Sequence, residues 1–172
     1  MKIDKIVVGE LQTNCYILSI DNKCLVIDPG DEYDKIRNAI GEKEIVGVII
    51  THYHFDHIGA LDYFNNSLIL DRNNLKEKEY NINDFNFEVI YTPGHKEDCI
   101  SLYFKECNCM FTGDFLFKNT IGRTDLEGGN IEAMDDSLDK IKNFNHNIKI
   151  YPGHGDSTTL KNELINNPYF DK

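Results

Sequence analysis

Histidine and aspartate side chains gather in four short segments of the sequence, each directly after an apolar run. Five of the six histidines fall in these segments, which random placement would rarely produce. Imidazole and carboxylate groups bind Zn²⁺ well, and also Fe²⁺ or Mn²⁺. The pattern therefore predicts a metal site whose candidate ligands are His52, His54, Asp56, His57, His95, Asp114 and His154.

The first segment, residues 51–57, carries four of these candidates in the string T-H-Y-H-F-D-H. His52 and His54 are two positions apart, so in an extended chain they point the same way and can hold one ion. Asp56 and His57 follow where the chain is expected to bend into a helix, so they point elsewhere. This geometry suits two ions rather than one. An H-x-H pair alone would more often be two histidines without a metal. The full string, together with the three later segments that carry His95, Asp114 and His154, favours metal binding.

The elements that must position these side chains are strands that end just before each ligand. Glycine stands immediately before His95, Asp114 and His154, where it lets the backbone turn tightly. Strand ends that meet at one edge of a sheet are a common place for sites. The strands in question are predicted at residues 45–50, 87–92, 108–112 and 148–151.

The hydrophobic pattern of the rest of the chain predicts two groups of strands, each accompanied by helices. The other expected strands span residues 2–8, 14–20, 23–28, 67–71 and 100–104, and residues 72–84 are expected to form a loop. Helices are expected at residues 33–40, 58–64, 131–144 and 158–166. Two batches of strands, each joined to helices, indicate an α/β fold with two sheets packed face to face and helices outside.

The length and charge of the chain favour a single domain and limit the partners it could bind. The 172 residues fit one domain, and 18 basic against 29 acidic residues give a formal net charge of −11. This acidity disfavours nucleic acid and anionic membranes as partners. No apolar stretch long enough to span a bilayer and no signal peptide is recognised, and five cysteines are an odd number, so reduced thiols and a cytoplasmic location are expected. Cys107 and Cys109 are expected to share one packed strand face, with a metal or redox pair as the alternative.

Several further motifs accompany the ligand segments. They are N-C-Y at 14–16, I-D-P-G at 27–30, T-P-G-H at 92–95, F-T-G-D at 111–114, I-G-R-T-D-L at 121–126, Y-P-G-H-G at 151–155 and N-P-Y-F at 167–170. With these motifs the sequence resembles the metallo-β-lactamase superfamily, and within it the small hydrolases similar to glyoxalase II (hydroxyacylglutathione hydrolase). The resemblance implies an αββα sandwich of two mixed sheets, with the site at one sheet edge. It also implies a single domain over residues 1–172 that lacks the C-terminal helical domain of full-length glyoxalase II.

The resemblance also implies roles for the candidate ligands. His52, His54 and His95 would bind a first metal ion, Asp56, His57 and His154 a second, and Asp114 would bridge the two. Asp28 would support the ligand loop without binding metal. Two divalent ions, with Zn²⁺ favoured over Fe²⁺ or Mn²⁺, would share a hydroxide that attacks a carbonyl group. Asp56 would orient that nucleophile as well as bind metal.

The expected substrate is a small thioester, such as S-lactoylglutathione or another hydroxyacyl thiol, because a thiolate leaves without a strong general acid. Lys96 is either a cation near an anionic substrate or a solvated loop lysine. Arg123 either binds a substrate carboxylate or pairs with Asp125. A persulfide dioxygenase-like enzyme with one iron, and a lactonase, remain alternatives. A non-catalytic metal-binding domain is less favoured because every ligand position is filled. The protein is expected to be a monomer or a small homo-oligomer.

Overall fold

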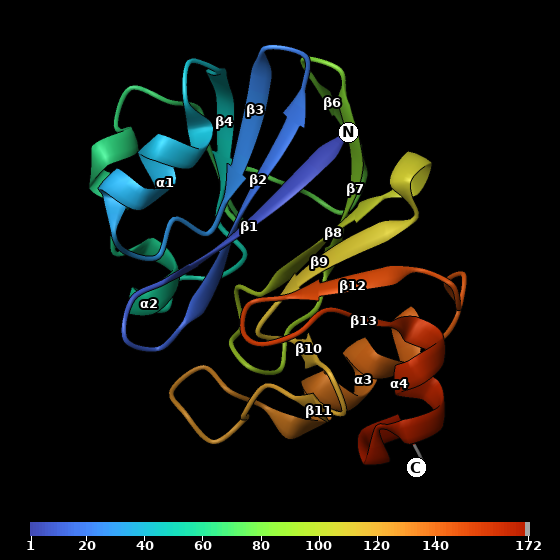
Figure 1. Ribbon diagram of the computed structural model, residues 1–172. Coiled ribbons are helices and arrows are strands. Elements are labelled where there is room, and N and C mark those ends of the chain that lie inside the picture. The colour runs from blue at the N-terminus through green and yellow to red at the C-terminus, as the bar shows by residue number, and fades with distance from the viewer. Residues whose placement is uncertain (171–172) are drawn as a thin grey trace.

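The N-terminal strands form a five-stranded mixed sheet in the computed structural model, which describes residues 1–170 (Figure 1). The strands lie in the order β1-β2-β3-β4-β5, with antiparallel pairing from β1 to β3 and parallel pairing from β3 to β5. Strands β2 to β4 are apolar on both faces because both faces of this sheet are covered. The strands are β1 (Lys2–Val8), β2 (Thr13–Ile20), β3 (Lys23–Ile27), β4 (Glu44–Ile49) and β5 (Ile69–Leu70).

The second sheet is also mixed and has six strands in the order β13-β12-β9-β8-β7-β6. Strands β9 and β12 run parallel, so the segments that follow them leave the sheet at the same edge. The strands are β6 (Glu79–Ile82), β7 (Phe85–Tyr91), β8 (Ile100–Phe104), β9 (Cys109–Gly113), β12 (Lys149–Pro152) and β13 (Thr158–Thr159). A separate hairpin joins β10 (Leu116–Phe117) to β11 (Thr120–Ile121).

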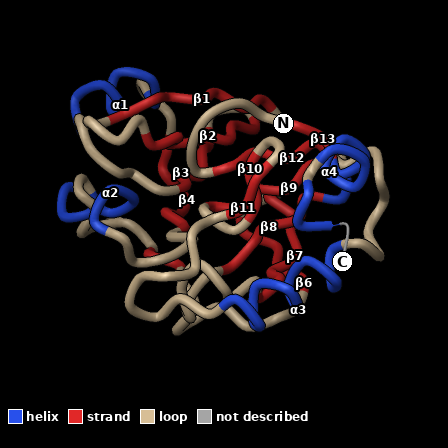
Figure 2. The backbone as a smooth tube through the Cα atoms, turned by 90° about the horizontal axis from the view of Figure 1, so that it is seen from below, coloured by secondary structure: helices blue, strands red, loops and turns tan. Residues whose placement is uncertain are grey.

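Helices cover the outer face of each sheet. Figure 2 shows α1 (Tyr33–Ile40) and α2 (Phe55–Ile58) on one side of the strands, and α3 (Ile131–Ile141) and α4 (Leu160–Asn166) on the other. Three short 3₁₀ turns complete the described elements: η1 (Leu61–Phe64), η2 (Lys105–Cys107) and η3 (Pro168–Phe170). No helix within residues 1–170 is long and apolar enough to cross a membrane.

Three apolar clusters hold these layers together. The central one joins the facing sides of the two sheets, for example Tyr16 of β2 with Phe111 of β9. A second cluster packs Ile36 and Ile40 of α1 on the first sheet, and a third packs α3 and α4 on the other sheet. The αββα sandwich predicted from the sequence is therefore confirmed.

Two predicted elements differ in the structure. The helix expected at residues 58–64 is divided, since α2 ends at Ile58 and the turn η1 begins at Leu61. Gly59 between them lies so close to the carbonyl of Gly30 that a Cβ there would collide with it, so this segment is shaped by a contact distant in sequence. The loop expected at 72–84 contains β6, which forms a hairpin with β7 through a turn at Asn83 and Asp84, both with positive φ.

The two cysteines of the C-x-C sequence do not share a strand face. Cys107 ends the turn η2 and is exposed, whereas Cys109 begins β9 and is buried. The expectation failed because the strand starts two residues later than Cys107. All five cysteines are free thiols.

Candidate metal centre

The four ligand segments converge beside the ends of β4, β7, β9 and β12, which belong to both sheets. Three groups of His and Asp side chains in the described residues have ligand atoms that all lie within 4.8 Å of one another. The groups are His52, His54 and His95; Asp56, His57 and His154; and His52, His57 and Asp114. All seven candidate ligands are therefore brought together.

The first group presents three imidazole nitrogens to one point. Nδ1 of His54 lies 3.1 Å from Nε2 of His52 and 2.8 Å from Nε2 of His95. His52 and His95 are buried and come from different sheets. Three converging nitrogens form a ligand set typical of Zn²⁺ and related ions.

The second group places a carboxylate against two imidazoles. Oδ2 of Asp56 lies 3.2 Å from Nε2 of His154 and 3.5 Å from Nε2 of His57. Asp56 is held from behind by Thr13, whose Oγ1 donates to the same Oδ2 at 2.8 Å.

Asp114 lies between the two groups. Its Oδ1 is 3.2 Å from Nε2 of His57, and its Oδ2 is 3.4 Å from Nε2 of His154 and 3.6 Å from Nε2 of His95. The carboxylate therefore faces one side chain of the first group and two of the second.

Two buried polar atoms indicate that this arrangement fits bound cations. Nε2 of His57 and Oδ1 of Asp114 are inaccessible to solvent and have no hydrogen-bond partner of acceptable geometry. Leaving buried polar atoms without partners is unfavourable. A divalent cation would give both atoms a partner, so the residues present suit the metal ions that their chemistry suggests.

The outer nitrogens of three histidines are occupied by hydrogen bonds. Nδ1 of His95 lies 2.8 Å from the carbonyl oxygen of Arg123, and Nδ1 of His154 lies 3.0 Å from that of Leu11. Nδ1 of His57 lies 2.8 Å from Oδ2 of Asp28. An acceptor at Nδ1 holds one proton there, so Nε2 is the nitrogen that faces the centre and would bind a metal ion.

Asp28 supports both the first ligand segment and His57. Its carboxylate accepts hydrogen bonds from the backbone N–H of Thr51 at 2.8 Å and from Oγ1 of Thr51 at 2.6 Å. Its backbone has a positive φ of 51°, which is uncommon for a residue other than glycine. Asp28 belongs to none of the three ligand groups.

Glycine is required where the segments cross. A Cβ at Gly153 would collide with Oδ1 of Asp114 and lie 2.7 Å from Cε1 of His57. A Cβ at Gly122 would collide with the carbonyl oxygen of Asp114. Both positions therefore let the backbone pass close to Asp114.

The histidines of the centre fall into two groups, those whose pKa is lowered and those whose pKa is raised. Burial, together with neighbouring imidazoles, lowers the pKa of His52 and His54, so both are neutral near pH 7. Burial acts in the same direction on His57 and His154, but nearby carboxylates outweigh it and raise the pKa of each to about 10.

The pKa values of Asp56 and Asp114 are lowered, whereas those of His57 and His154 are raised. Burial tends to raise the pKa of each carboxylate, but hydrogen bonds to His154, together with the charge of His57, hold both pKa values below the ordinary range. Ionised carboxylates would therefore face protonated His57 and His154. A bound cation would replace those protons.

The two candidate substrate residues are engaged with acidic neighbours. Nζ of Lys96 lies 3.0 Å from Oδ2 of Asp98, which also accepts the backbone N–H of Tyr53. Nε and Nη2 of Arg123 each donate to Asp125 at 2.8 Å, and both side chains are exposed. The ion pair that the sequence allowed for Arg123 is thus present.

Sequence reasoning missed the roles of Thr13 and of the carbonyl groups of Leu11 and Arg123. Backbone carbonyls carry no signal in the sequence, because every residue has one. Thr13 stands beside the N-C-Y motif, but only the packed structure brings it to Asp56.

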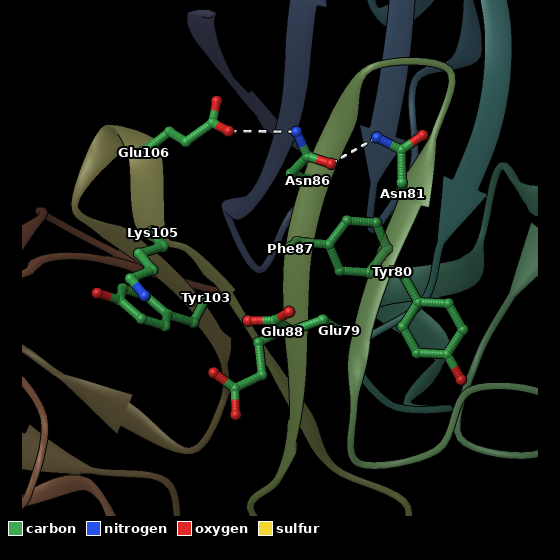
Figure 3. Close-up of a pocket in the computed structure, with 9 residues that line it drawn as sticks. All are labelled: Glu79, Tyr80, Asn81, Asn86, Phe87, Glu88, Tyr103, Lys105 and Glu106. Carbon is green, nitrogen blue, oxygen red and sulfur yellow. Dashed lines mark hydrogen bonds between the residues drawn. The ribbon is translucent and has the colours of Figure 1, made fainter.

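A hollow on β6, β7 and β8 lies away from this centre (Figure 3). In it, Asn86 donates to Glu106 and accepts from Asn81. Asn86 lies near the beginning of β7, whereas His95 follows its end. None of the candidate ligands lines the hollow, so we do not place the function there.

Comparison with known proteins agrees with this geometry. Residues 8–71 and 70–154 match the family model described as "Metallo-beta-lactamase superfamily". The chain is 34% identical to the probable metallo-hydrolase YqgX of Bacillus subtilis (strain 168), over 99% of this chain and 98% of that protein. It is 30% identical to the hydroxyacylglutathione hydrolase GloC of Haemophilus influenzae (strain ATCC 51907 / DSM 11121 / KW20 / Rd), over 99% of each chain.

One solved structure is similar to this chain along almost the whole length of both. The crystal structure of TTHA1623 in a di-iron-bound form has a TM-score of 0.85 and 28% sequence identity, and the match covers 96% of this chain and 99% of that one. Both the family match and the fold extend over the segments that supply the seven clustered side chains. The protein therefore belongs to the metallo-β-lactamase superfamily and is a metallo-hydrolase with His and Asp clusters suited to divalent metal ions.

Proposed function

We propose that the protein is a dinuclear metal-dependent hydrolase of small thioesters, such as S-lactoylglutathione or another hydroxyacyl thiol. The observation that carries the proposal is the position of Asp114 between two separate groups of three ligands. The relative named hydroxyacylglutathione hydrolase matches this chain almost from end to end, which supports the reaction class. A single domain over residues 1–172 would then carry the whole site.

The seven ligands would be divided as the two groups suggest. His52, His54 and His95 would hold one ion, Asp56, His57 and His154 the other, and Asp114 would contact both. Bound divalent ions would lower the pKa of a water molecule and polarise a substrate carbonyl group. We propose Zn²⁺ as the native metal, and the di-iron form of TTHA1623 makes Fe²⁺ the first alternative to test.

The side chains of the protein would position the reactants. Oδ2 of Asp56 is held by Thr13 and faces His154, so the carboxylate is fixed beside the centre, where it could accept a hydrogen bond from the attacking water. The water oxygen bonds to the carbonyl carbon, the C–S bond breaks, and the sulfur leaves with the electron pair as a thiolate. The water protons are released to solvent or to the products, which are a carboxylate and a thiol.

Lys96 and Arg123 would attract an anionic thiol carrier. Asp125 occupies Nε and Nη2 of Arg123, so Nη1 can still donate to a substrate carboxylate. Lys96 directly follows His95, and its charge reaches His54, whose pKa it helps to lower.

The test is loss of the thioester absorbance of S-D-lactoylglutathione with purified protein reconstituted with zinc. His54→Ala is the control, because it removes a ligand of the first group, and metal content is measured on both proteins. Turnover by the wild type alone, with two metals per chain, supports the proposal.

Absence of turnover in protein that holds two metals would contradict the glutathione thioester, and other thioesters and lactones would then be tried. One iron per chain, with oxygen consumed in the presence of a persulfide, would overturn the hydrolase proposal in favour of a dioxygenase.

A further inference from the structure

A pocket of about 460 Å³ adjoins the candidate metal centre on the side of Asp56. It lies between the turn that joins β1 to β2 and the start of α2. Asp56 and Thr13, which form a hydrogen bond with each other, belong both to the centre and to the wall of this pocket. Its volume falls within the range of about 300–1,000 Å³ typical of small-molecule sites.

Two large apolar side chains line the pocket and are open to solvent. Phe55 is 75% exposed and Leu11 is 54% exposed, while Val8 forms a buried part of the wall. Single exposed apolar residues are ordinary, but two that line one pocket beside a reactive centre offer apolar surface to a ligand there.

Both residues are tied to metal-ligand positions. The carbonyl oxygen of Leu11 accepts the Nδ1 hydrogen bond of His154, and Phe55 directly precedes Asp56 in α2. The apolar walls are therefore held at a fixed place relative to the second ligand group. A molecule seated between them would have its reacting end at Asp56.

The charges around the centre are distributed unevenly. Lys96 and Arg123 belong to the segments that support His95, in the first ligand group. The residues that line the pocket, all within residues 1–170, include no lysine or arginine, and Glu10 and Asp31 add negative charge. An anionic carrier would be repelled there, whereas a neutral apolar group would not.

We propose that this pocket binds the acyl chain of the substrate, with the anionic thiol carrier directed toward Lys96 and Arg123. The proposal rests on the thioester hydrolase function and extends it: among small thioesters, those with an unbranched apolar acyl chain longer than the three-carbon lactoyl group should be the better substrates. Each methylene that enters the pocket leaves water and gains contacts with Phe55 and Leu11.

The experiment compares acetyl, butanoyl, hexanoyl and octanoyl thioesters of glutathione with zinc-loaded enzyme. The value of kcat/KM should rise about fourfold for each added methylene until the pocket is filled. Phe55→Ser and Leu11→Ser should each reduce this dependence on chain length, and Leu11→Ser leaves the carbonyl group at His154 in place. Leu68→Ser is the matched control, because Leu68 is also 54% exposed but does not line the pocket.

A second measurement does not depend on turnover. Calorimetry compares the binding of acetate, butanoate, hexanoate and octanoate to the zinc-loaded protein. Affinity that rises with chain length in the wild type and in Leu68→Ser, but not in Phe55→Ser, supports the acyl pocket even if no thioester is hydrolysed. Affinities that do not depend on chain length would overturn it, even if S-lactoylglutathione is a good substrate.

Discussion

Oδ2 of Asp28 lies 2.8 Å from Nδ1 of His57, and both side chains are almost completely buried. The same carboxylate accepts two hydrogen bonds from Thr51, at the start of the ligand segment 51–57. One acidic side chain outside the ligand set therefore fixes the orientation of His57 and the path of the chain that carries His52 and His54.

Asp28→Asn should weaken metal binding more than it weakens the fold. The amide nitrogen of asparagine cannot accept the hydrogen of His57 or Thr51, so the proton of His57 is no longer held at Nδ1. We expect the affinity for the second zinc equivalent to fall about 10- to 100-fold. Competition with a chromophoric chelator measures this, with Asp34→Asn on α1 as control. Equal affinities in all three proteins would show that Asp28 is not a support of the centre.

Metal binding should release protons and become tighter as the pH rises. The pKa values of His57 and His154 are raised to about 10, so at pH 7 to 8 both imidazoles carry a proton that a cation must displace. His52 and His54 have lowered pKa values and contribute no proton in this range. Calorimetry in buffers of different ionisation enthalpy counts the protons. Zinc affinity that stays constant from pH 7 to pH 9 would contradict this assignment.

Arg123→Ala should raise KM for a glutathione thioester by up to about fivefold, as expected for a solvent-exposed ion pair, and leave the metal content unchanged. The guanidinium is exposed and contacts Asp125, so a substrate can reach it. His95 contacts only the backbone carbonyl of residue 123, which alanine retains, so the metal ligands stay in place. Steady-state kinetics and metal analysis of the same sample separate the two effects, with Arg37→Ala as the control. An unchanged KM would leave Arg123 as a surface ion pair.

Phe111→Ala should be among the most destabilising single changes in the central cluster. Phe111 is buried, stacks on Tyr151 at a centroid distance of 5.1 Å, and meets Tyr16 edge-on at 5.0 Å. Removing such a ring costs about 3–5 kcal/mol of the free energy of unfolding. Urea denaturation of the metal-depleted protein measures the loss. Ile165→Ala, at an exposed position of α4, should change it by less than about 0.5 kcal/mol.

Local patterns in the sequence were enough to predict most of the fold. Strands such as β1 and helices such as α1 follow directly from hydrophobic spacing, and the prediction of two sheets with helices outside them was confirmed. The patterns failed where a distant contact determines the shape, as at Gly59, where the close approach of Gly30 accompanies the division of the expected helix.

The sequence by itself also determined which side chains could bind metal, because residue type and spacing set the available ligand atoms. The spacing of these residues alone did not give their grouping, which came from the family resemblance. Only the tertiary structure decided the distances between the ligand atoms and which backbone groups hold them. Asp114 lies between two groups because β9 and β12 run parallel and end at one edge. The carbonyls of Leu11 and Arg123 reach His154 and His95 through packing between segments 143 and 28 residues apart, and backbone groups that are the same in every residue leave no trace in the sequence.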